Sequence, residues 1–461
     1  MSVRDDVRGN AFVVSAAGSG HGKTLVMLAL VRALVAANLR VQPYKIGPDY
    51  IDARFYARVA GRPAYNLDLT LDGTGGVQAL VAATRGDADV VLCEGMMGLF
   101  DGADDGTGST ADVARALGAR VILVLDCCAA SQTAAAVALG LRSYDPSLEI
   151  AGVVLNRVGG EAHARAVREA CARAGITVLA TVRSDAAFEA ADRRLGLDPA
   201  AVERRALAVE RLALELGESL ALMRVFPQSG ATASRAFATY RSSLRGRARA
   251  RVRHPAAPRI AYAQDDAFWF TYAETLDALR LAGADVVPFS PLRGRRLPPR
   301  TRGVWIGGGY PEDFAAQLEA NASMRAALAS ALGAGMPCYA ECGGMMYLAE
   351  SLENERGTFA MVGALAGSTS IAKPVLHMGY REARVVADTP LDLAGTRVKG
   401  YEFHYATARL AEPTHAYEFD DAYVDGAIRN NVIAGFLHRH FLPESAPIAR
   451  FVAACAAQEF S

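Results

Sequence analysis

Apolar and polar residues alternate in blocks along the first half of the chain, and these blocks predict a parallel β-sheet. The short apolar runs predicted to be strands are 11–16, 41–46, 88–93, 120–126 and 150–156. The longer segments between them, rich in Ala, Leu and Arg, are predicted to be helices at 23–38, 111–118, 131–142 and 161–174. Continuous apolar strands alternating with helices are typical of a sheet covered on both faces. We also expect an edge strand at 176–180 and a mostly helical stretch at 199–225.

A second alternating block begins at Arg259. Its predicted strands are 259–263, 284–289, 302–306 and 336–340, and its predicted helices are 271–282, 320–333 and 343–351. Short strands should follow residue 358, with a last helix near 444–457. We therefore predict an α/β fold with two domains, an N-terminal phosphate-loop domain at 1–226 and a C-terminal α/β domain at 259–461.

The linker predicted between the domains, 227–258, is crowded with arginine at 241–253. It lacks the interleaved aromatic residues that stack on bases, so we interpret it as a solvated linker rather than a nucleic-acid site. The formal net charge of +0 gives no general attraction to nucleic acid or to anionic membranes.

Length and composition bound the remaining classes. The 461 residues exceed one core of about 150 residues. No apolar run reaches the length of a transmembrane helix, and the charged N-terminus does not resemble a secretory signal. The seven cysteines are scattered and lack C-x-x-C spacing, which favours free thiols over a disulfide framework or zinc site. We expect a cytoplasmic protein without membrane or nucleic-acid partners.

A glycine-rich turn follows the first predicted strand. Residues 12–30 read FVVSAAGSGHGKTLVMLAL, so an apolar strand enters a turn that opens into a helix at Lys23-Thr24. This is the context of a phosphate-binding loop, whose backbone N–H groups and lysine contact phosphates while its hydroxyl contacts Mg²⁺. An ordinary glycine-rich turn is the alternative, and Lys-Thr at the helix start favours nucleotide. The predicted ATP-binding residues here are Gly18, Ser19, Gly20, His21, Gly22, Lys23 and Thr24.

Acidic residues follow two other predicted strands. Glu94 comes at the end of strand 88–93, and the segment YKIGPDYID at 44–52 supplies Lys45, Asp49 and Asp52. The carboxyl ends of parallel strands face the ligand crevice, and Mg²⁺ requires hard oxygen ligands. We predict metal ligands at Thr24, Asp49, Asp52 and Glu94 and substrate contacts at Lys45, Asp49 and Asp52. The alternative interpretation of Asp49 is a helix N-cap.

A candidate nucleophile stands in the second block. Residues 336–348 read MPCYAECGGMMYL, so an apolar strand ends at Cys342 and Gly343-Gly344 starts a helix. A sharp strand-to-helix turn exposes a nucleophile, and small neighbours permit the strained backbone. An oxyanion loop is expected from Gly308, Gly309 and Gly343, and His438 is the candidate base. The cysteines interpreted as packing residues are Cys93, Cys127, Cys128, Cys171 and Cys338.

The two halves together resemble the cobyrinic acid a,c-diamide synthase family. The motifs that carry this resemblance are KIGPDYID at 45–52, EGMMGLFDG at 94–102, GGGYPE at 307–312, AECGGMMYL at 340–348 and EFHY at 402–405. The family joins an ATP-dependent domain like dethiobiotin synthetase to a class I-type glutamine amidotransferase domain. The resemblance extends from about residue 11 to 445.

The resemblance implies a reaction and several residue roles. In the family, ATP and Mg²⁺ activate the a and c acetate groups of cobyrinic or hydrogenobyrinic acid, and ammonia from glutamine converts them into amides. By resemblance, Asp101 serves carboxylate activation, Asn156-Arg157 forms the turn that recognises the base, and Cys342 with His438 forms the glutaminase pair. The implied partners are a tetrapyrrole and glutamine, and a homodimer is one assembly to consider.

Three places depart from the usual family pattern. Tyr56 stands where the family usually has His, and ADRRLGL at 191–197 replaces PERHLGL. His438 is followed by Arg439-His440, whereas common amidotransferases have Pro-Glu there. Alternatives are a nickel-sirohydrochlorin a,c-diamide synthase, a cobyric acid synthase, which is usually longer, and a nucleotide switch of the partitioning type. The switch loop usually reads KGGxGK, whereas Gly18 holds the place of its extra lysine.

Overall fold

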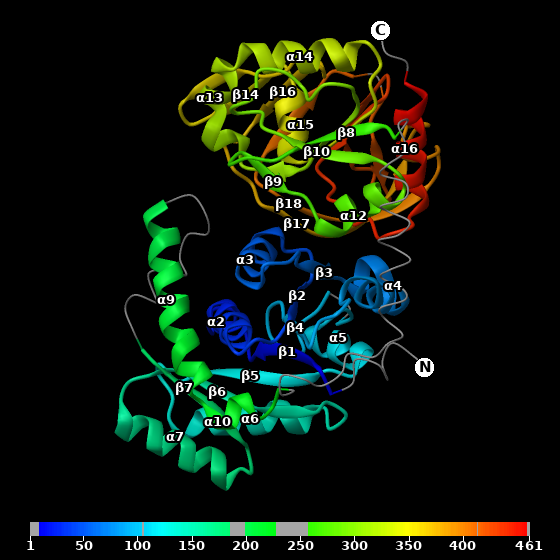
Figure 1. Ribbon diagram of the computed structural model, residues 1–461. Helices are drawn as coiled ribbons and strands as arrows, with labels where there is room; N and C mark the ends of the chain where they lie inside the picture. Colours follow the sequence, from blue (N-terminus) through cyan, green and yellow to red (C-terminus); the bar gives the residue numbers. More distant parts are fainter. Residues whose placement is uncertain (1–8, 104–105, 185–198, 227–256, 413, 459–461) are drawn as a thin grey trace. The chain divides into compact units, whose positions relative to one another are not determined.

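The computed structural model describes residues 9–103, 106–184, 199–226, 257–412 and 414–458. The chain divides into two compact units, 1–242 and 243–461 (Figure 1). Most of the predicted linker and the departure at 191–197 lie outside the described residues. No helix within the described ranges has the length and apolar character needed to cross a membrane.

The N-terminal unit is built on a seven-stranded parallel sheet in the order β3-β2-β4-β1-β5-β6-β7. Its strands are β1 (Ala11–Ala16), β2 (Val41–Ile46), β3 (Tyr65–Leu67), β4 (Val90–Glu94), β5 (Arg120–Asp126), β6 (Ile150–Val158) and β7 (Val178–Arg183). Its helices are α2 (Lys23–Ala36), α3 (Tyr50–Ala60), α4 (Leu69–Thr84), α5 (Thr110–Leu117), α6 (Gln132–Tyr144), α7 (Glu161–Arg173), α9 (Pro199–Gly217) and α10 (Leu220–Met223).

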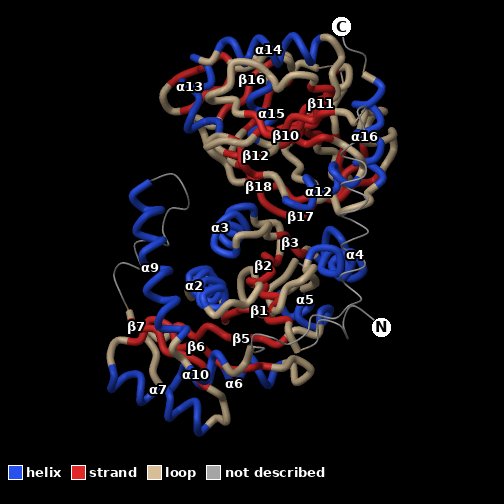
Figure 2. The backbone as a smooth tube through the Cα atoms, in the orientation of Figure 1, coloured by secondary structure: helices blue, strands red, loops and turns tan. Residues whose placement is uncertain are grey.

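The core of this unit explains the order of its layers. One cluster of buried residues joins α2, α3 and α9 to alternate residues of the central strands, including Phe12, Val14 and Leu92. The α4, α5, α6 and α7 helices contact the sheet and one another rather than this cluster (Figure 2). The predicted parallel sheet with β7 at its edge is therefore confirmed, and the short strand β3 at the other edge was not predicted.

The C-terminal unit contains a six-stranded sheet in the order β10-β8-β11-β13-β23-β22, in which only β22 runs antiparallel. Smaller sheets pair β12 with β9, join β15-β14-β16-β19, and join β18-β17-β20-β21. The first strands and helices are β8 (Arg259–Ala263), β9 (Phe268–Phe270), α12 (Ala273–Leu281), β10 (Asp285–Phe289), β11 (Thr301–Ile306), β12 (Gly308–Gly309), η1 (Pro311–Phe314), α13 (Ala315–Ala320), α14 (Ala322–Gly333) and β13 (Cys338–Glu341).

The rest of this unit is mostly short strands, as predicted. The strands are β14 (Ser351–Asn354), β15 (Gly357–Ala360), β16 (Gly367–Ser370), β17 (His377–Val385), β18 (Arg397–His404), β19 (Thr407–Leu410), β20 (Tyr417–Phe419), β21 (Val424–Asp425), β22 (Ala427–Arg429) and β23 (Val432–Gly435). The helices are α15 (Gly343–Leu348), which precedes them, and α16 (Ala446–Ala457), which follows them. The helix predicted at 320–333 is confirmed as α14, which begins at Ala322 because the Asn321 side chain caps it by accepting from the Met324 N–H. The helix predicted at 343–351 ends early, and β14 begins at Ser351.

Candidate active sites

The predicted phosphate loop connects β1 to α2. Gly22 precedes the helix with a φ of 87°, and a Cβ there would lie 2.4 Å from Asn156 Nδ2, so only glycine fits. Lys23 is 7% exposed, and its Nζ donates to the carbonyls of Gly18 at 2.8 Å and Met97 at 2.5 Å. Burial lowers the pKa of Lys23, and the charge of Glu94 opposes that effect. The lysine is thus held over the loop.

The last residues of β6 contact the same loop, and the turn predicted at Asn156-Arg157 is part of this strand, where its register shifts. Asn156 Nδ2 donates to the His21 carbonyl at 2.9 Å, and the Arg157 guanidinium donates to the Gly20 carbonyl. Arg157 has a φ of 58°, and its side chain pairs with Asp126 at 3.0 Å. The structure therefore brings the two predicted groups of nucleotide-binding residues, the phosphate loop and Asn156-Arg157, into contact. It also places Asp126, which was not predicted, beside Arg157.

All five of the predicted metal and substrate residues meet at the carboxyl edge of the sheet. Lys45 Nζ lies 2.8 Å from Asp52 Oδ2, 3.3 Å from Glu94 Oε2 and 3.6 Å from Asp49 Oδ2. Thr24 Oγ1 lies 2.7 Å from Glu94 Oε1 and 3.4 Å from Asp52 Oδ2. Asp49 also caps α3 by accepting from the backbone of Ile51 and Asp52, as its alternative interpretation predicted.

Lys45, Asp52 and Glu94 are almost fully buried, whereas the Asp49 side chain is 32% exposed. Burial raises the pKa of Glu94 to about 7, although the charge of Lys45 works in the opposite direction. Burial also raises the pKa of Asp49, helped by the neighbouring charge of Asp52. For Lys45, burial alone would lower the pKa, but the carboxylates of Glu94, Asp52 and Asp49 outweigh it and raise the pKa. The protonated, positively charged form of Lys45 is therefore strongly favoured.

The oxygen donors of this cluster suit Mg²⁺ in the presence of nucleotide. Thr24 Oγ1 and carboxylate oxygens of Asp52 and Glu94 converge, and Mg²⁺ commonly binds one or two carboxylates together with substrate phosphates. Among the described residues, no group of three or more His, Cys, Asp or Glu side chains is arranged to hold a metal by itself. The fit therefore depends on phosphate oxygens and Thr24 completing the ligand set.

Asp101 follows β4 in a loop that contacts the start of the phosphate loop. Its Oδ2 accepts from the Gly98 N–H at 2.9 Å. A Cβ on Gly98 would lie 2.5 Å from Asp101 Oδ2 and 2.8 Å from the Ala17 carbonyl, so glycine is required for this close approach. The Asp101 side chain is exposed, which leaves it able to contact a ligand beside the loop.

Cys342 occupies a strained turn between β13 and α15. Its φ of 50° and ψ of −112° are rarely adopted by non-glycine residues. The turn is tied to the neighbouring strand because the Cys342 N–H donates to the Gly435 carbonyl at 2.7 Å. The side chain is 7% exposed. The predicted strand-to-helix position of this thiol matches the structure.

The predicted oxyanion glycines and the predicted base converge on this turn. A Cβ on Gly343 would lie 3.1 Å from the Gly309 nitrogen, and one on Gly308 would lie 2.9 Å from His438 Cε1. The strand β12 that carries Gly308 and Gly309 pairs with β9. His438 is 1% exposed and is held by reciprocal backbone hydrogen bonds with Tyr401. Residues far apart in sequence thus form one site.

His438 has an acidic neighbour that the sequence analysis missed. Glu341, directly before Cys342, places its Oε1 3.6 Å from His438 Nδ1. Burial would lower the pKa of His438, but interactions with Cys342 and Glu341 raise it to about 10. A signal was present in the sequence: a carboxylate ends an otherwise apolar strand at the position before the nucleophile.

The structure also places the cysteines interpreted as packing residues and Tyr56, one of the departures from the family pattern. Cys128 is exposed, so the prediction that it is a packing residue is wrong; it lies in the turn after β5, where its N–H donates to Asp126. Cys93, Cys127, Cys171 and Cys338 are buried, as predicted. Tyr56, which replaces the usual family histidine, is a residue of α3 that is fully buried in the core cluster.

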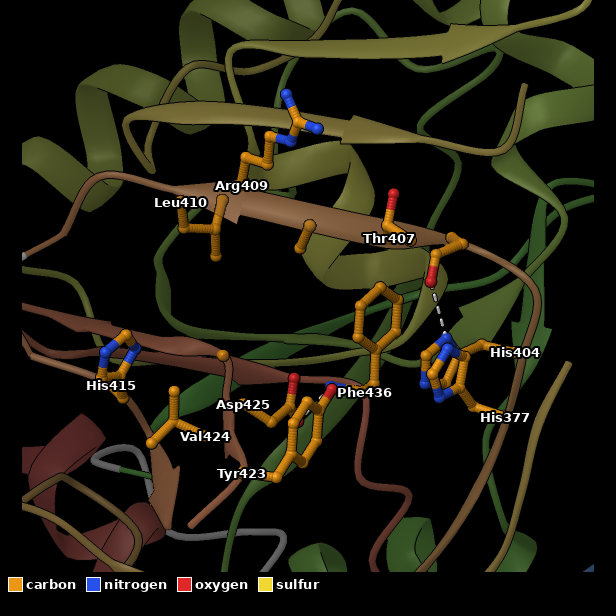
Figure 3. A pocket seen from close by; sticks show the side chains of 13 residues that line it. His377, His404, Thr407, Arg409, Leu410, His415, Tyr423, Val424, Asp425 and Phe436 are labelled. Atoms are coloured by element: carbon orange, nitrogen blue, oxygen red, sulfur yellow. Dashed lines mark hydrogen bonds between the residues drawn. The ribbon is translucent and has the colours of Figure 1, made fainter. Parts of the chain in front are cut away.

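A separate pocket of about 310 Å³ lies in the C-terminal unit (Figure 3). His377 stacks on His404, and His404 stacks on Phe436 with ring centroids 3.8 Å apart. Burial lowers the pKa of His404 to about 4, so this ring is neutral at physiological pH. The lining includes neither Cys342 nor His438, and the sequence analysis did not predict this pocket.

Comparisons with known proteins agree with the division of the chain. The family described as the CobQ/CobB/MinD/ParA nucleotide binding domain matches residues 12–197. The CobB/CobQ-like glutamine amidotransferase domain matches residues 259–446.

Curated relatives match nearly the whole chain. The cobyrinate a,c-diamide synthase of Synechococcus sp. is 38% identical, covering 96% of this chain and 98% of the relative. The hydrogenobyrinate a,c-diamide synthase of Mycobacterium tuberculosis is 39% identical, covering 97% of this chain and 98% of the relative. The cobyrinate a,c-diamide synthase of Streptococcus sanguinis is 35% identical, with 96% and 98% covered.

Proposed function

Because the chain belongs to the family of cobyrinate and hydrogenobyrinate a,c-diamide synthases, we propose that it amidates the a and c acetate carboxylates of cobyrinic or hydrogenobyrinic acid. It is an amidotransferase-type ligase with a nucleotide-binding domain and a glutamine amidotransferase domain. In the proposed reaction, ATP activates each carboxylate and glutamine supplies the ammonia. The observation that carries this proposal is the convergence of Cys342, His438 and the glycine loop in a chain that also holds a phosphate loop.

In the proposed first half-reaction, a substrate carboxylate oxygen attacks the γ-phosphorus of ATP, giving an acyl phosphate and ADP. Lys23, held over the phosphate loop, offsets charge on the transferring phosphoryl group. Thr24, Asp52 and Glu94 would hold Mg²⁺, which when bound with ATP offsets phosphate charge. Asp49 would complete that set, and we assign Asp101, in the loop beside the phosphate loop, to the carboxylate being activated.

The cationic side chain of Lys45 contributes a second function at the same edge. Its positive charge favours the ionised forms of Asp49, Asp52 and Glu94, and at Asp49 and Glu94 it works against the effect of burial on the pKa. We assign it to positioning the anionic substrate together with Asp49 and Asp52. The Asn156-Arg157 segment of β6, which contacts the phosphate loop, is assigned to the adenine base.

In the proposed second half-reaction, the Cys342 thiolate attacks the amide carbon of glutamine. Backbone N–H groups of Gly308, Gly309 and Gly343 are the candidate donors to the oxyanion, and His438 gives a proton to the departing nitrogen. Ammonia leaves, and water hydrolyses the glutamyl thioester to glutamate and free thiol. Ammonia then attacks the acyl phosphate, and phosphate departs as the amide forms.

Replacing Cys342 tests the proposed source of ammonia. A Cys342→Ser enzyme should lose glutamine-dependent amidation by about 1000-fold or more while keeping amidation with ammonium, because only the nucleophile is removed. Product amides are counted by mass spectrometry. Cys128→Ser, which alters an exposed cysteine, is the matched control and should behave as wild type. Undiminished use of glutamine by Cys342→Ser would show that another group is the nucleophile.

The tetrapyrrole is tested in the same assay. Relatives with cobyrinate and hydrogenobyrinate names are nearly equally similar, at 38% and 39% identity, so cobalt-containing and metal-free substrates are both supplied. Nickel-sirohydrochlorin is included as the competing tetrapyrrole. We expect two amides on a corrinoid and none on nickel-sirohydrochlorin; the opposite outcome would reassign the substrate.

A further inference from the structure

The residues that follow His438 do not orient its imidazole. Arg439 is buried and pairs with Asp392, with one guanidinium nitrogen 3.1 Å from Asp392 Oδ1. His440 is hydrogen bonded to the buried Glu274. Both side chains therefore have acidic partners of their own. The place held by Pro-Glu in common amidotransferases is occupied here by residues with other contacts.

Glu341, which lies far before His438 in the sequence, faces the imidazole in the folded chain. It is the last residue of β13, its side chain is buried, and its Oε1 lies 3.6 Å from His438 Nδ1. Its other oxygen, Oε2, accepts from Tyr339 Oη at 2.9 Å and from the Arg439 N–H at 3.5 Å. These contacts fix the carboxylate, so that its free edge is directed at His438.

The position of Glu341 is coupled directly to that of the nucleophile. Glu341 and Cys342 are consecutive, and β13 pairs with β23, which leads through Phe436 and Leu437 to His438. Glu341 pairs with Gly435 in this ladder, and the Cys342 N–H donates to the same Gly435. One strand pair therefore sets the acid, the thiol and the imidazole.

We propose that Glu341 is the third member of the glutaminase group, a positioning residue that accepts the Nδ1–H of His438 and so directs Nε2 toward Cys342. This inference deepens the proposed function and rests on glutamine hydrolysis at Cys342. The separation of 3.6 Å is an ion-pair distance, and such contacts often shorten when substrate binds. In this arrangement the acid precedes the nucleophile in the sequence. The order along the chain is free to vary because the pairing of β13 with β23 brings the three residues together.

The charge of Glu341 has a directional effect on the imidazole. A nearby carboxylate favours imidazolium, and imidazolium favours the thiolate it faces. Besides Cys342, two titratable groups of β18 interact with His438: the Glu402 carboxylate, which also favours imidazolium, and His404, whose own pKa is lowered mainly by burial and also by the His438 charge. Removing the Glu341 charge should thus lower the pKa of His438, while Glu402 and His404 remain in place in the variant.

The test compares Glu341→Gln with Glu341→Asp in hydrolysis of glutamine to glutamate by the full chain. For Glu341→Gln we expect kcat to fall about 100-fold or more with KM little changed, because orientation rather than binding is lost. The basic limb of the pH profile should move to lower pH by about one unit, since the protonated imidazole is less favoured. Glu341→Asp, which keeps the charge, should retain the basic limb even if kcat falls.

Controls separate positioning from packing. Glu353→Gln changes an exposed glutamate of β14 and should match wild type in both rate and pH profile. Ammonium-dependent amidation should be unaffected in every Glu341 variant, which reports an intact N-terminal unit. If Glu341→Gln hydrolyses glutamine at nearly the wild-type rate with an unmoved basic limb, the proposal is wrong. An equal shift in Glu341→Asp would likewise overturn it, in favour of packing.

Failure of the proposed function would look different. Glutamine hydrolysis is measured without a corrinoid, so a wild-type enzyme that hydrolyses glutamine but amidates no corrinoid would contradict only the substrate assignment. If Cys342→Ser still hydrolysed glutamine, the nucleophile and the role of Glu341 would both be contradicted.

Discussion

Lys45 shows how a single buried side chain controls the charge of the N-terminal site. Its ammonium group lies within 3.6 Å of three carboxylates, and both Lys45 and Glu94 are less than 5% exposed. The three carboxylates carry more negative charge than one lysine neutralises. This excess suits a site that also receives a divalent cation with its nucleotide.

Replacing Lys45 with Met should destabilise the protein by about 3 kcal/mol, because breaking a buried ion pair leaves carboxylates without compensation. The thermal midpoint should fall by about 6 °C or more. The loss should be smaller at pH 6 than at pH 8, since Glu94, whose pKa is already raised to about 7, takes up a proton more easily at lower pH. Differential scanning calorimetry measures both.

The control for this variant is Lys399→Met, which removes an exposed lysine from β18 and should change the midpoint little. An unchanged midpoint for Lys45→Met at both pH values would mean that the cluster does not need the lysine as a counter-charge.

The roles of site residues could be predicted from the sequence where these residues stand in a rigid local pattern. Cys342 and the phosphate-loop residues qualify, because their glycine neighbours permit the unusual backbone angles at these turns. Glu341 could not be assigned, since whether its carboxylate faces His438 depends on the pairing of β13 with β23. The packing interpretation of Cys128 failed because an apolar run continued past the end of β5 into an exposed turn.

At the scale of elements, the short strand β12 holds the glycine loop against the proposed base, His438. Gly308 is close to His438 and to the Phe270 ring of β9, and Gly309 approaches the backbone of Ala267. Such close approach leaves no room for a Cβ. The loop geometry is therefore set by packing between strands.

Gly308→Ala should reduce glutamine-dependent amidation while leaving ammonium-dependent amidation intact. The new methyl would meet His438 Cε1 at 2.9 Å and displace the imidazole, which we expect to lower the glutamine-dependent rate about 100-fold. Gly333→Ala, at the end of α14 where a Cβ meets nothing within 4 Å, is the matched control. Equal glutamine-dependent rates for the two variants would show that β12 has no part in glutamine hydrolysis.

Elements with strong periodicity were predicted closely, and those fixed by tertiary pairing were not. The expected strands 11–16, 41–46 and 120–126 coincide with β1, β2 and β5. The helices α3 and α4 were missed, and α4 contains Gly73 with non-helical backbone angles, which weakens its helical pattern. The two-residue strand β12 has no sequence period to reveal it.

At the scale of the whole molecule, one chain carries a nucleotide-binding unit and an amidotransferase unit. The two α/β halves could be predicted because apolar strands and helices alternate twice along the chain. The domain boundaries near 226 and 259 stay a prediction, since 227–256 lie outside the described residues. In the proposed reaction, joining both units in one polypeptide would supply ammonia in step with carboxylate activation.

The most direct measurement of this account follows the nitrogen atom. Enzyme, ATP, Mg²⁺ and cobyrinic or hydrogenobyrinic acid are incubated with amide-¹⁵N-glutamine in buffer that contains unlabelled ammonium, and the product is analysed by mass spectrometry. We predict two new amides, both predominantly ¹⁵N, with label lost in Cys342→Ser. A product whose amides carry the unlabelled nitrogen of the buffer, or whose label survives in Cys342→Ser, would contradict the coupling of glutamine hydrolysis at Cys342 to carboxylate amidation.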